Sequence, residues 1–420
     1  MYFKALDYIN SLPRCSFKRY GITGILELLE LMGNPQNELK YIHIAGTNGK
    51  GSISTFCARS LEEAGFKVGL YTSPYIVKFR ERIQINGEYI KEQELADLVF
   101  KLKVKVQFLN KRGIFLTGFD FITALSLQYF YENSCDFVVL EVGMGGRLDS
   151  TNVIPAAQIA IISHIDYDHI LELGGADGSI LNIAREKAGI LKYGGRCVCY
   201  EDQRYEVFEF LKSECIRKNV EFIVSYKPHN VKCTDKFTYF EYGSVGFKLK
   251  LLGLHQVRNA MVCVTALLNL GVNINYIKRG LELAFIPARF EVVSKNPVFV
   301  LDGAHNEDGI NSLIDTLKLY SLVPKIGILS IINTKNFEGM MFKLKNIFDV
   351  IILTKMADKR ALPVQTLKET AYKFSIKFIE QDNVHLAINQ AKEIATNSGI
   401  VVAFGSLYFA AQVRKIVLNT

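Results

Sequence analysis

The alternation of short apolar runs with helical patterns is the feature that most constrains the fold of this chain. Five candidate strands rich in Val, Ile and Leu occur early, at residues 41–45, 67–71, 136–142, 158–163 and 196–200. Such continuous apolar runs are typical of strands that are buried on both faces of a parallel sheet. After the first run, apolar residues recur at helical spacing up to Gly65, where we expect that helix to end. The pattern predicts βαβ units.

The later part of the chain predicts a second α/β domain. Residues 236–251 alternate as an antiparallel hairpin does, and a helix is expected over 256–270. Residues 286–297 carry two prolines and no long periodic pattern, so we expect the domain boundary there. Further candidate strands follow at 298–302, 325–331, 349–354, 376–380 and 400–404. We therefore predict an α/β protein with a parallel-sheet domain at 1–288 and a doubly wound, Rossmann-like domain at 289–420.

Composition excludes several classes of protein. The chain has 49% hydrophobic and 22% charged residues, as ordinary globular proteins do, and its apolar runs fall short of the roughly 20 residues of a membrane span. The first residues do not resemble a signal peptide, and the eight cysteines form no C-x-x-C pair. We therefore expect the protein to be located in the reducing cytoplasm. The charge of +8 is spread along the chain without a run of five or more basic residues, which fits small anionic substrates at least as well as nucleic acid, and we expect no nucleic-acid partner. We expect a monomer without membrane partners.

The stretch AGTNGKGS, residues 45–52, predicts a phosphate-binding loop because it joins a strand to a helix. Lys50 would supply a positive charge and Ser52 a hydroxyl for Mg²⁺. An additional glycine, Gly51, separates them. The alternative interpretation is a glycine turn with a surface lysine. Glu141 ends the apolar run FVVL, where a buried carboxylate would suit Mg²⁺ unless it is a solvated strand terminus.

Two further segments add polar groups to the predicted sheet edge. The stretch GMGGRLDSTN carries Arg147, Asp149, Ser150 and Asn152, and its glycines do not have the spacing of a dinucleotide-binding loop. The stretch SHIDYDHI then places four candidate metal ligands within six residues, namely His164, Asp166, Asp168 and His169. They suit Mg²⁺ with one imidazole better than a zinc cage, although about two could be ordinary loop residues. Lys187, in REKAGI, would by itself be a surface charge at a helix end.

Taken together, these segments and several others form an ordered series that runs from about residue 20 to residue 415. The series comprises AGTNGKGS, TSP with FRERI, LEVGMGGRLDSTN, DH, REKAGI, HQVRNA, PARF, LDGAHN and GSLYF. It resembles the folylpolyglutamate synthase and dihydrofolate synthase family of Mur-ligase-like enzymes. The resemblance implies an ATP-dependent acid–amino-acid ligase that joins L-glutamate to a folate, with addition to dihydropteroate as a second activity. The γ-phosphoryl group of ATP would first move to the carboxylate, and the amine would then attack the acyl phosphate.

The resemblance also implies roles for individual residues. The phosphates of ATP would be held by Asn48, Gly49, Lys50, Gly51 and Ser52. Ser52 would face one Mg²⁺, and a second would be held by Ser73, Glu141 and His169. Lys187 matches a lysine that the family carbamylates to serve the metal site, which makes it a candidate catalytic residue with Lys50 and Arg289.

Other implied roles concern the far side of the nucleotide and the pterin. Asn259, Arg289, Asp302 and His305 would complete the ATP site, and the two domains are expected to close over ATP. The folate pocket would be lined by Thr117, Phe119, Leu148, Asp149 and Ser150. For these five residues, plain core or turn structure is the alternative.

Three departures from the family pattern concern substrate details. Asp120 replaces a glutamate, Tyr75 replaces a histidine, and Glu307 replaces a proline. Two other functions remain as alternatives. A Mur-type ligase for a peptidoglycan precursor is disfavoured because roughly 40 residues precede the phosphate loop. An inactive nucleotide-binding regulator is disfavoured because Lys50, Glu141, His169 and Lys187 are all present.

Overall fold

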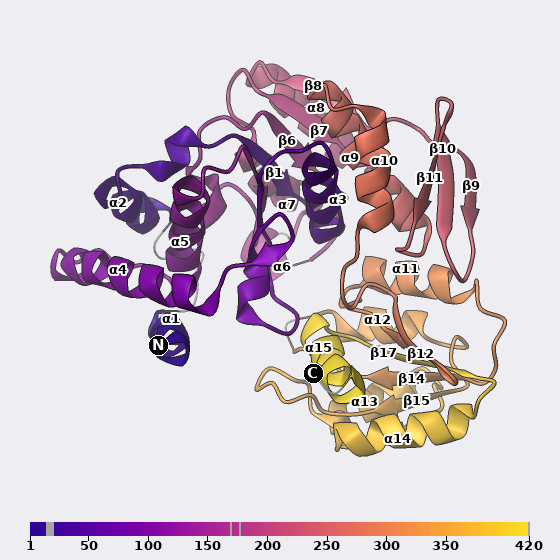
Figure 1. Cartoon of the computed structure of the whole chain (residues 1–420). Coiled ribbons are helices and arrows are strands. Elements are labelled where there is room, and N and C mark those ends of the chain that lie inside the picture. The colour runs from indigo at the N-terminus through magenta and orange to yellow at the C-terminus, as the bar shows by residue number, and fades with distance from the viewer. Residues whose placement is uncertain (14–20, 169, 176–177, 334, 419–420) are drawn as a thin grey trace. The chain divides into compact units, whose positions relative to one another are not determined.

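The computed structural model describes residues 1–13, 21–168, 170–175, 178–333 and 335–418. By their contacts, residues Met1–Pro228 and Arg258–Ala284 form one compact unit, and His229–Val257 with Phe285–Thr420 form a second (Figure 1). Our predicted division assigned 229–257 to the first domain, whereas these residues group with the second unit. The domain limits 1–288 and 289–420 stay a prediction.

The first unit is built on an eight-stranded sheet with the order β4-β3-β2-β5-β1-β6-β7-β8. The strands are β1 Tyr41–Ala45, β2 Val68–Tyr71, β3 Ile83–Ile85, β4 Glu88–Tyr89, β5 Phe137–Glu141, β6 Ile159–Ile162, β7 Arg196–Cys199 and β8 Glu221–Val224. The pairs β2–β3 and β3–β4 are antiparallel, and the other neighbouring pairs are parallel. All five strands that we predicted here are present.

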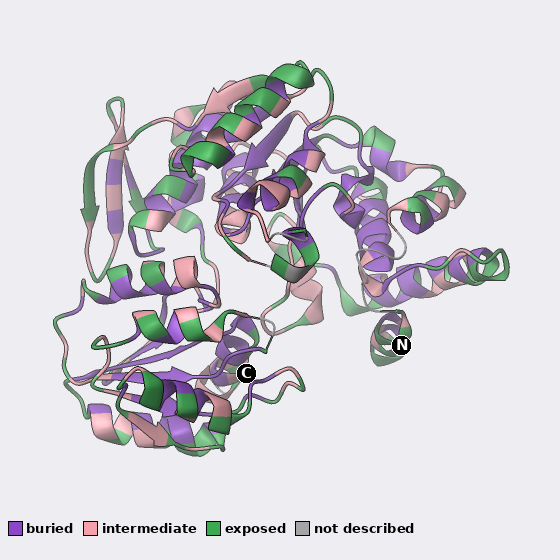
Figure 2. Cartoon of the chain, turned by 180° about the vertical axis from the view of Figure 1, so that it is seen from behind, coloured by how far each residue is buried: buried purple, intermediate pink, exposed green. Residues whose placement is uncertain are grey.

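The sheet, whose buried strands are purple in Figure 2, is accompanied in the first unit by a set of helices. They are α1 Tyr2–Ser11, α2 Thr23–Leu31, α3 Lys50–Glu63, α4 Glu92–Lys111, α5 Gly118–Glu132, α6 Ile170–Leu173, α7 Ile180–Lys187, α8 Tyr205–Arg217 and α10 Ile274–Leu283, together with most of α9 Leu254–Asn269. Helices α10 and α3 pack so closely at Gly280 that a Cβ there would lie 2.4 Å from the Cα of Ser60.

The position of β1 explains where a ligand can bind in this unit. All five residues of β1 are buried, since β5 and β6 pair with it on either side. The chain passes from β1 to β2 and β5 on one side and then to β6 on the other. The carboxyl end of β1 therefore lies where the strand order reverses, which is the usual ligand position in open parallel sheets.

The second unit contains two sheets. A six-stranded sheet has the order β12-β13-β17-β14-β15-β16, and all its neighbouring pairs are parallel except β12 with β13. A three-stranded sheet has the order β11-β10-β9. The strands are β9 His229–Cys233, β10 Thr238–Tyr242, β11 Val245–Leu249, β12 Glu291–Lys295, β13 Val298–Leu301, β14 Lys325–Leu329, β15 Val350–Leu353, β16 Phe378–Glu380 and β17 Ile400–Phe404. The helices are α11 Glu307–Leu317, α12 Phe337–Lys343, α13 Val364–Lys373, α14 Val384–Ala395 and α15 Leu407–Leu418.

The predicted fold class is confirmed: both units are α/β, and each contains a mainly parallel sheet. Strands β3, β4, β8, β9 and β12 were not predicted. Of these, β12 lies within residues 286–297, the segment in which we expected the domain boundary. Among the described residues, no helix is both long and apolar enough to span a bilayer.

Candidate functional site

The loop between β1 and α3 holds two glycines where a side chain would not fit. Gly46 has a φ of +153°, and a Cβ there would lie 1.8 Å from the Oγ of Ser163. Gly49 has a φ of +88°, and its Cβ would lie 2.4 Å from the Oδ1 of Asn259. Gly51 differs, because its Cβ would make an ordinary contact of 3.7 Å with the Oε1 of Glu141. The loop thus depends on the absence of side chains at Gly46 and Gly49.

Helix α3 begins in a way that suits an anion. Gly49 is its N-cap, and no side chain caps its first amides within the described part of the chain. Its first turn carries no acidic residue and instead begins with Lys50. Because the first backbone N–H groups of a helix lack intrahelical partners, this end favours a negatively charged ligand.

Two lysine ammonium groups meet at one carbonyl of this loop. The Nζ of Lys50 donates to the carbonyl oxygens of Gly46 and Thr47, each at 3.0 Å. The Nζ of Lys187, at the end of α7, donates to the same Gly46 oxygen at 2.8 Å. Lys187 is only 4% exposed, so it is not a surface charge. Two positive charges on one oxygen repel each other, and a bound anion would offset that repulsion.

The loop after β6 fixes the phosphate loop from the other side. The backbone N–H of Thr47 donates to the carbonyl of His164 at 2.8 Å. The hydroxyl of Thr47 donates to the carbonyl of Asp166 at 2.9 Å, and the hydroxyl of Ser163 donates to the carbonyl of Asn48 at 2.8 Å. The phosphate loop therefore has a defined shape before any ligand binds.

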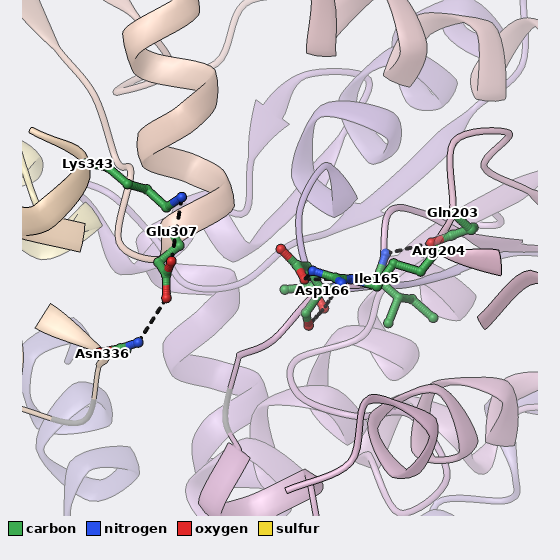
Figure 3. Close-up of polar contacts among 8 residues, drawn as sticks. Ile165, Asp166, Gln203, Arg204, Glu307, Asn336 and Lys343 are labelled. Carbon is green, nitrogen blue, oxygen red and sulfur yellow. Dashed lines mark hydrogen bonds and ion pairs between the residues drawn. The ribbon is translucent and has the colours of Figure 1, made fainter. Parts of the chain in front are cut away.

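Two side chains after β7 support the β6 loop in turn. Gln203 accepts from the N–H of Ile165 at 3.0 Å and donates to the carbonyl of Ser163 at 2.8 Å. Arg204 binds the carboxylate of Asp166 at 2.9 Å (Figure 3). These contacts fix the backbone of the loop after β6. The backbone in turn orients the described metal-ligand candidates that this loop carries.

The structure describes most of the residues predicted to hold metal, but not all of them. Glu141 ends β5, is 4% exposed, and accepts from the N–H of Ser73 at 3.1 Å. Ser52 is also buried at 4% exposure, one residue beyond the Gly51 backbone that lies near the Glu141 carboxylate. His169 lies outside the described residues. A carboxylate and hydroxyls form an oxygen ligand set, which fits Mg²⁺.

Two of the predicted substrate residues, Thr117 and Ser150, are hydrogen-bonded to Asp120 at the start of α5. Asp120 accepts from the N–H of Thr117 at 2.9 Å and from its hydroxyl at 2.7 Å. The hydroxyl of Ser150 donates to the other oxygen of Asp120 at 2.6 Å. The departure from the family pattern at Asp120 is therefore a capping residue, which joins the α5 N-terminus to the loop after β5.

The loop after β5 folds around Asp149. Its carboxylate accepts from the N–H and the hydroxyl of Thr151, at 3.0 and 2.6 Å, and from the N–H of Met144 at 2.9 Å. Burial raises the pKa of Asp149, and these hydrogen bonds oppose the rise. The ring of Phe119 lies beside it, since a Cβ on Gly143 would be 2.5 Å from the Phe119 Cζ and 3.2 Å from Asp149 Oδ2. Leu148 in the same loop is half-buried.

In the second unit, the loop after β13 closes on its own carboxylate. Asp302 accepts from the N–H groups of Phe290 and Ala304, both at 2.8 Å. Burial raises its pKa, while Arg289 and the two amides act in the opposite direction. Ala288 and Phe290 both have positive φ, at +55° and +45°, which is uncommon for residues with a Cβ. This strained backbone holds Arg289 near the loop, where its Nη1 would be 3.1 Å from a Cβ on Gly303.

The same loop leads into α11 through polar contacts. The Nδ1 of His305 lies 2.9 Å from the carbonyl oxygen of Gly303, and Asn306 caps α11 by accepting from the N–H of Gly309 at 2.8 Å. Glu307 accepts from Asn336 at 2.9 Å and lies 3.6 Å from the ammonium of Lys343 (Figure 3). The glutamate that replaces the family's proline thus ties α11 to the start of α12.

Sequence reasoning missed the supporting residues of the first unit. Gln203 gave no signal, because its role depends on a loop 38 residues away. His43 did give one, as a polar residue within the apolar run YIHIA. Its ring is buried and lies 2.9 Å from the hydroxyl of Thr151, which in turn binds Asp149.

Two protein families match the chain along most of its length. Residues 44–267 match the Mur ligase middle domain, and residues 288–407 match the Mur ligase, glutamate ligase domain. The phosphate loop and its supports fall in the first match, and Arg289, Asp302 and His305 fall in the second. The fold and these matches define a Mur-type ligase.

Relatives that match over almost their full length show which family of Mur-type ligases this is. The chain is 34% identical to the folylpolyglutamate synthase of Lacticaseibacillus casei, over 100% of this chain and 99% of that protein. It is 33% identical to the dihydrofolate synthase/folylpolyglutamate synthase of Bacillus subtilis, with 94% of each covered. The structure of Mycobacterium tuberculosis folylpolyglutamate synthase complexed with ADP and AMPPCP superposes with a TM-score of 0.89 at 26% identity, over 99% of this chain and 98% of that one. The chain belongs to the folylpolyglutamate synthase and dihydrofolate synthase family.

Proposed function

We propose that this chain is an ATP-dependent ligase that adds L-glutamate to folates, and that it also converts dihydropteroate to dihydrofolate. Family membership supports the reaction type, since the relatives named above carry these two activities in their names. The nucleotide complex of the M. tuberculosis protein supports ATP as the energy source. A peptidoglycan-precursor ligase finds no support among these relatives.

The observation that carries the proposal is the phosphate loop of the first unit. Gly46 and Gly49 keep its backbone open, Lys50 and Lys187 bring two cations to one carbonyl, and Glu141 lies buried beside it. A structural turn needs none of these features together. A site for a polyphosphate and a metal ion needs all of them.

Individual residues of the chain have distinct roles in the proposed reaction. The α3 N-terminus and Lys50 bind and orient the phosphates of ATP, so that the γ-phosphoryl group faces the folate carboxylate. Mg²⁺ would neutralise phosphate charge, with Ser52 facing one ion and Ser73, Glu141 and His169 holding a second. The amine of glutamate attacks the resulting acyl phosphate and releases phosphate. Carbamylation of Lys187 stays a prediction, as do the nucleotide contacts of Asn259, Arg289, Asp302 and His305.

The pterin is assigned to the group of residues around Asp149. Phe119 offers a flat apolar face, and the Asp149 carboxylate is an acceptor for the ring N–H groups of a pterin. Thr117 and Ser150 act through Asp120, which holds α5 against the loop that carries Leu148 and Asp149. The proposal further includes Mg²⁺ as the metal, a cytoplasmic location and a monomeric enzyme that does not bind nucleic acid.

The test is substrate-dependent release of ADP by the purified protein. ATP, Mg²⁺ and glutamate are supplied with tetrahydrofolate, dihydropteroate or a muramyl precursor in turn. We expect turnover with tetrahydrofolate and dihydropteroate and none with the muramyl precursor. Turnover with the precursor alone would identify a peptidoglycan ligase, and ADP binding without turnover on any substrate would favour a regulatory protein.

A further inference from the structure

A buried chain of three side chains joins the centre of the first sheet to the pterin residues. His43 lies in β1 and is 1% exposed. Its Nε2 is 2.9 Å from the hydroxyl of Thr151, and that hydroxyl is 2.6 Å from Oδ1 of Asp149. Residues 43 and 151 are 108 positions apart, so only the folded sheet brings them together.

The chemistry of the three groups fixes the direction of these hydrogen bonds. An ionised carboxylate only accepts, so the Thr151 hydroxyl uses its one proton on Asp149. The same hydroxyl must then accept from His43, which requires the proton of the imidazole on Nε2. The other nitrogen, Nδ1, is buried and has no hydrogen-bond partner among the described residues. Burial and the nearby Lys192 lower the pKa of His43 to about 3, so the ring stays neutral.

We propose that His43 is a positioning residue for pterin recognition: it fixes the Thr151 hydroxyl so that Asp149 stays an ionised, oriented acceptor. The inference rests on the proposed function, because it takes Asp149 as a contact of the pterin ring. A carboxylate presents only acceptors to the ring N–H groups, whereas a protonated carboxyl would turn one oxygen into a donor. Burial favours the protonated form, and donors such as Thr151 favour the ionised one.

Other charged and titratable groups lie near Asp149 and His43. Asp149, Asp120 on α5 and Arg82 all act electrostatically on Tyr71 of β2. Lys192 lies near His43. A comparison of two variants that differ only at position 43 leaves all of these unchanged.

The test uses His43→Gln and His43→Asn in the full-length protein. The glutamine amide can place an N–H where Nε2 lies, whereas the asparagine amide reaches only the Nδ1 position, and neither variant titrates. With dihydropteroate as the probe, we expect His43→Asn to raise its KM about tenfold, since a hydrogen bond that supports a charged group is lost. His43→Gln should stay within about twofold of the wild type, and the KM for ATP should change little in either.

A pH profile separates positioning from stability. In His43→Asn the Thr151 hydroxyl is no longer held toward Asp149, so the pKa of Asp149 rises. The acid limb of kcat/KM for dihydropteroate should therefore move to higher pH in His43→Asn but not in His43→Gln. Equal KM values and equal acid limbs in the two variants would overturn the inference while the wild type remains active. An inactive wild type with either pterin would instead overturn the proposed function itself.

Thr151→Val keeps the test available if His43→Asn does not fold. It preserves side-chain shape and removes the hydroxyl, so it should reproduce the KM increase. Adding His43→Gln to Thr151→Val should then have no further effect, because the donor has nothing left to orient. A KM for dihydropteroate that Thr151→Val leaves unchanged would contradict the inference.

Discussion

The loops that follow β1 and β13 occupy comparable places in their own units, yet the helices they lead into begin with side chains of opposite charge. Each leaves a parallel strand and leads into a helix, α3 or α11. Helix α3 has a glycine N-cap, no side-chain cap among the described residues, and Lys50 in its first turn. Helix α11 has Asn306 as a side-chain cap and Glu307 and Asp308 in its first turn.

The difference shows what a ligand must supply in each unit. Acidic residues stabilise the positive end of a helix, so α11 is already satisfied by its own side chains. A lysine in the same position is unfavourable, so α3 gains from an external anion. The loop after β13 likewise uses Asp302 to bind its own backbone amides, whereas no side chain among the described residues caps the helix that follows β1.

The largest expected effect comes from a lysine that supports the first loop. Lys187→Ala should lower turnover by about a thousandfold, because a buried charge next to the reacting phosphate is removed. The affinity for ADP, measured by calorimetry, should change less than about threefold, since Lys50 and the α3 amides remain. Lys343→Ala is the matched control beside α11, and it should change turnover less than about twofold. Near-normal turnover in Lys187→Ala would show that the implied carbamate role does not hold here.

A backbone change tests whether the first loop needs space at Gly49. Gly49→Ala combines a left-handed φ with a Cβ placed 2.4 Å from the Asn259 Oδ1. We expect kcat/KM for ATP to fall about a hundredfold, since the loop must shift. Gly65→Ala is the control, because φ there is +91° and nothing lies within 4 Å of its Cβ. The control should lose about 1–2 kcal/mol of stability and keep its kcat/KM. Equal losses of activity in both would assign the effect to strain alone.

The pH dependence of stability should have opposite signs for one buried group in each unit. Burial lowers the pKa of His43 to about 3, from 6.5, so its stabilisation is lost as pH falls below 6.5 and the unfolded state takes up a proton. Burial raises the pKa of Asp302 above 3.8, so its contribution is lost as pH rises through that range. Relative to His43→Gln, the wild type should lose about 2 kcal/mol between pH 7 and pH 5. Urea unfolding at both values measures this, and parallel curves would contradict it.

The sequence predicted the strands that are apolar throughout and missed those that depend on a distant partner. Strand β1 was predicted to the residue because all its side chains are buried. Strand β9 was missed because its residues are mostly exposed and it pairs only with β10. Strand β12 was missed because it is an antiparallel edge strand with a register shift. Local hydrophobicity carries no information about such pairings.

The same limit applies to the candidate site. The glycine-rich loop between β1 and α3 could be predicted because its glycines and Lys50 are adjacent in sequence. The convergence of Lys187 on Gly46 could not, since the two residues are 141 positions apart and their contact depends on the order of the strands. The position of Asp302 after a strand was visible, but its two hydrogen bonds to backbone amides were not.

The smallest expected effect sharpens the comparison of the two helix starts. Asn306→Ala removes the side-chain cap of α11 and should lower the free energy of unfolding by about 1 kcal/mol. Asn306→Ser keeps an oxygen for the Gly309 amide and should recover most of that loss, as measured by urea unfolding.

Helix α3 offers no such substitution, because its N-cap is Gly49 and no described side chain caps it. Its stabilisation should come from ligand instead, so saturating ADP should raise the unfolding midpoint of the first unit in both Asn306 variants as much as in the wild type. A smaller response to ADP in Asn306→Ala alone would show that the two loops are not independent.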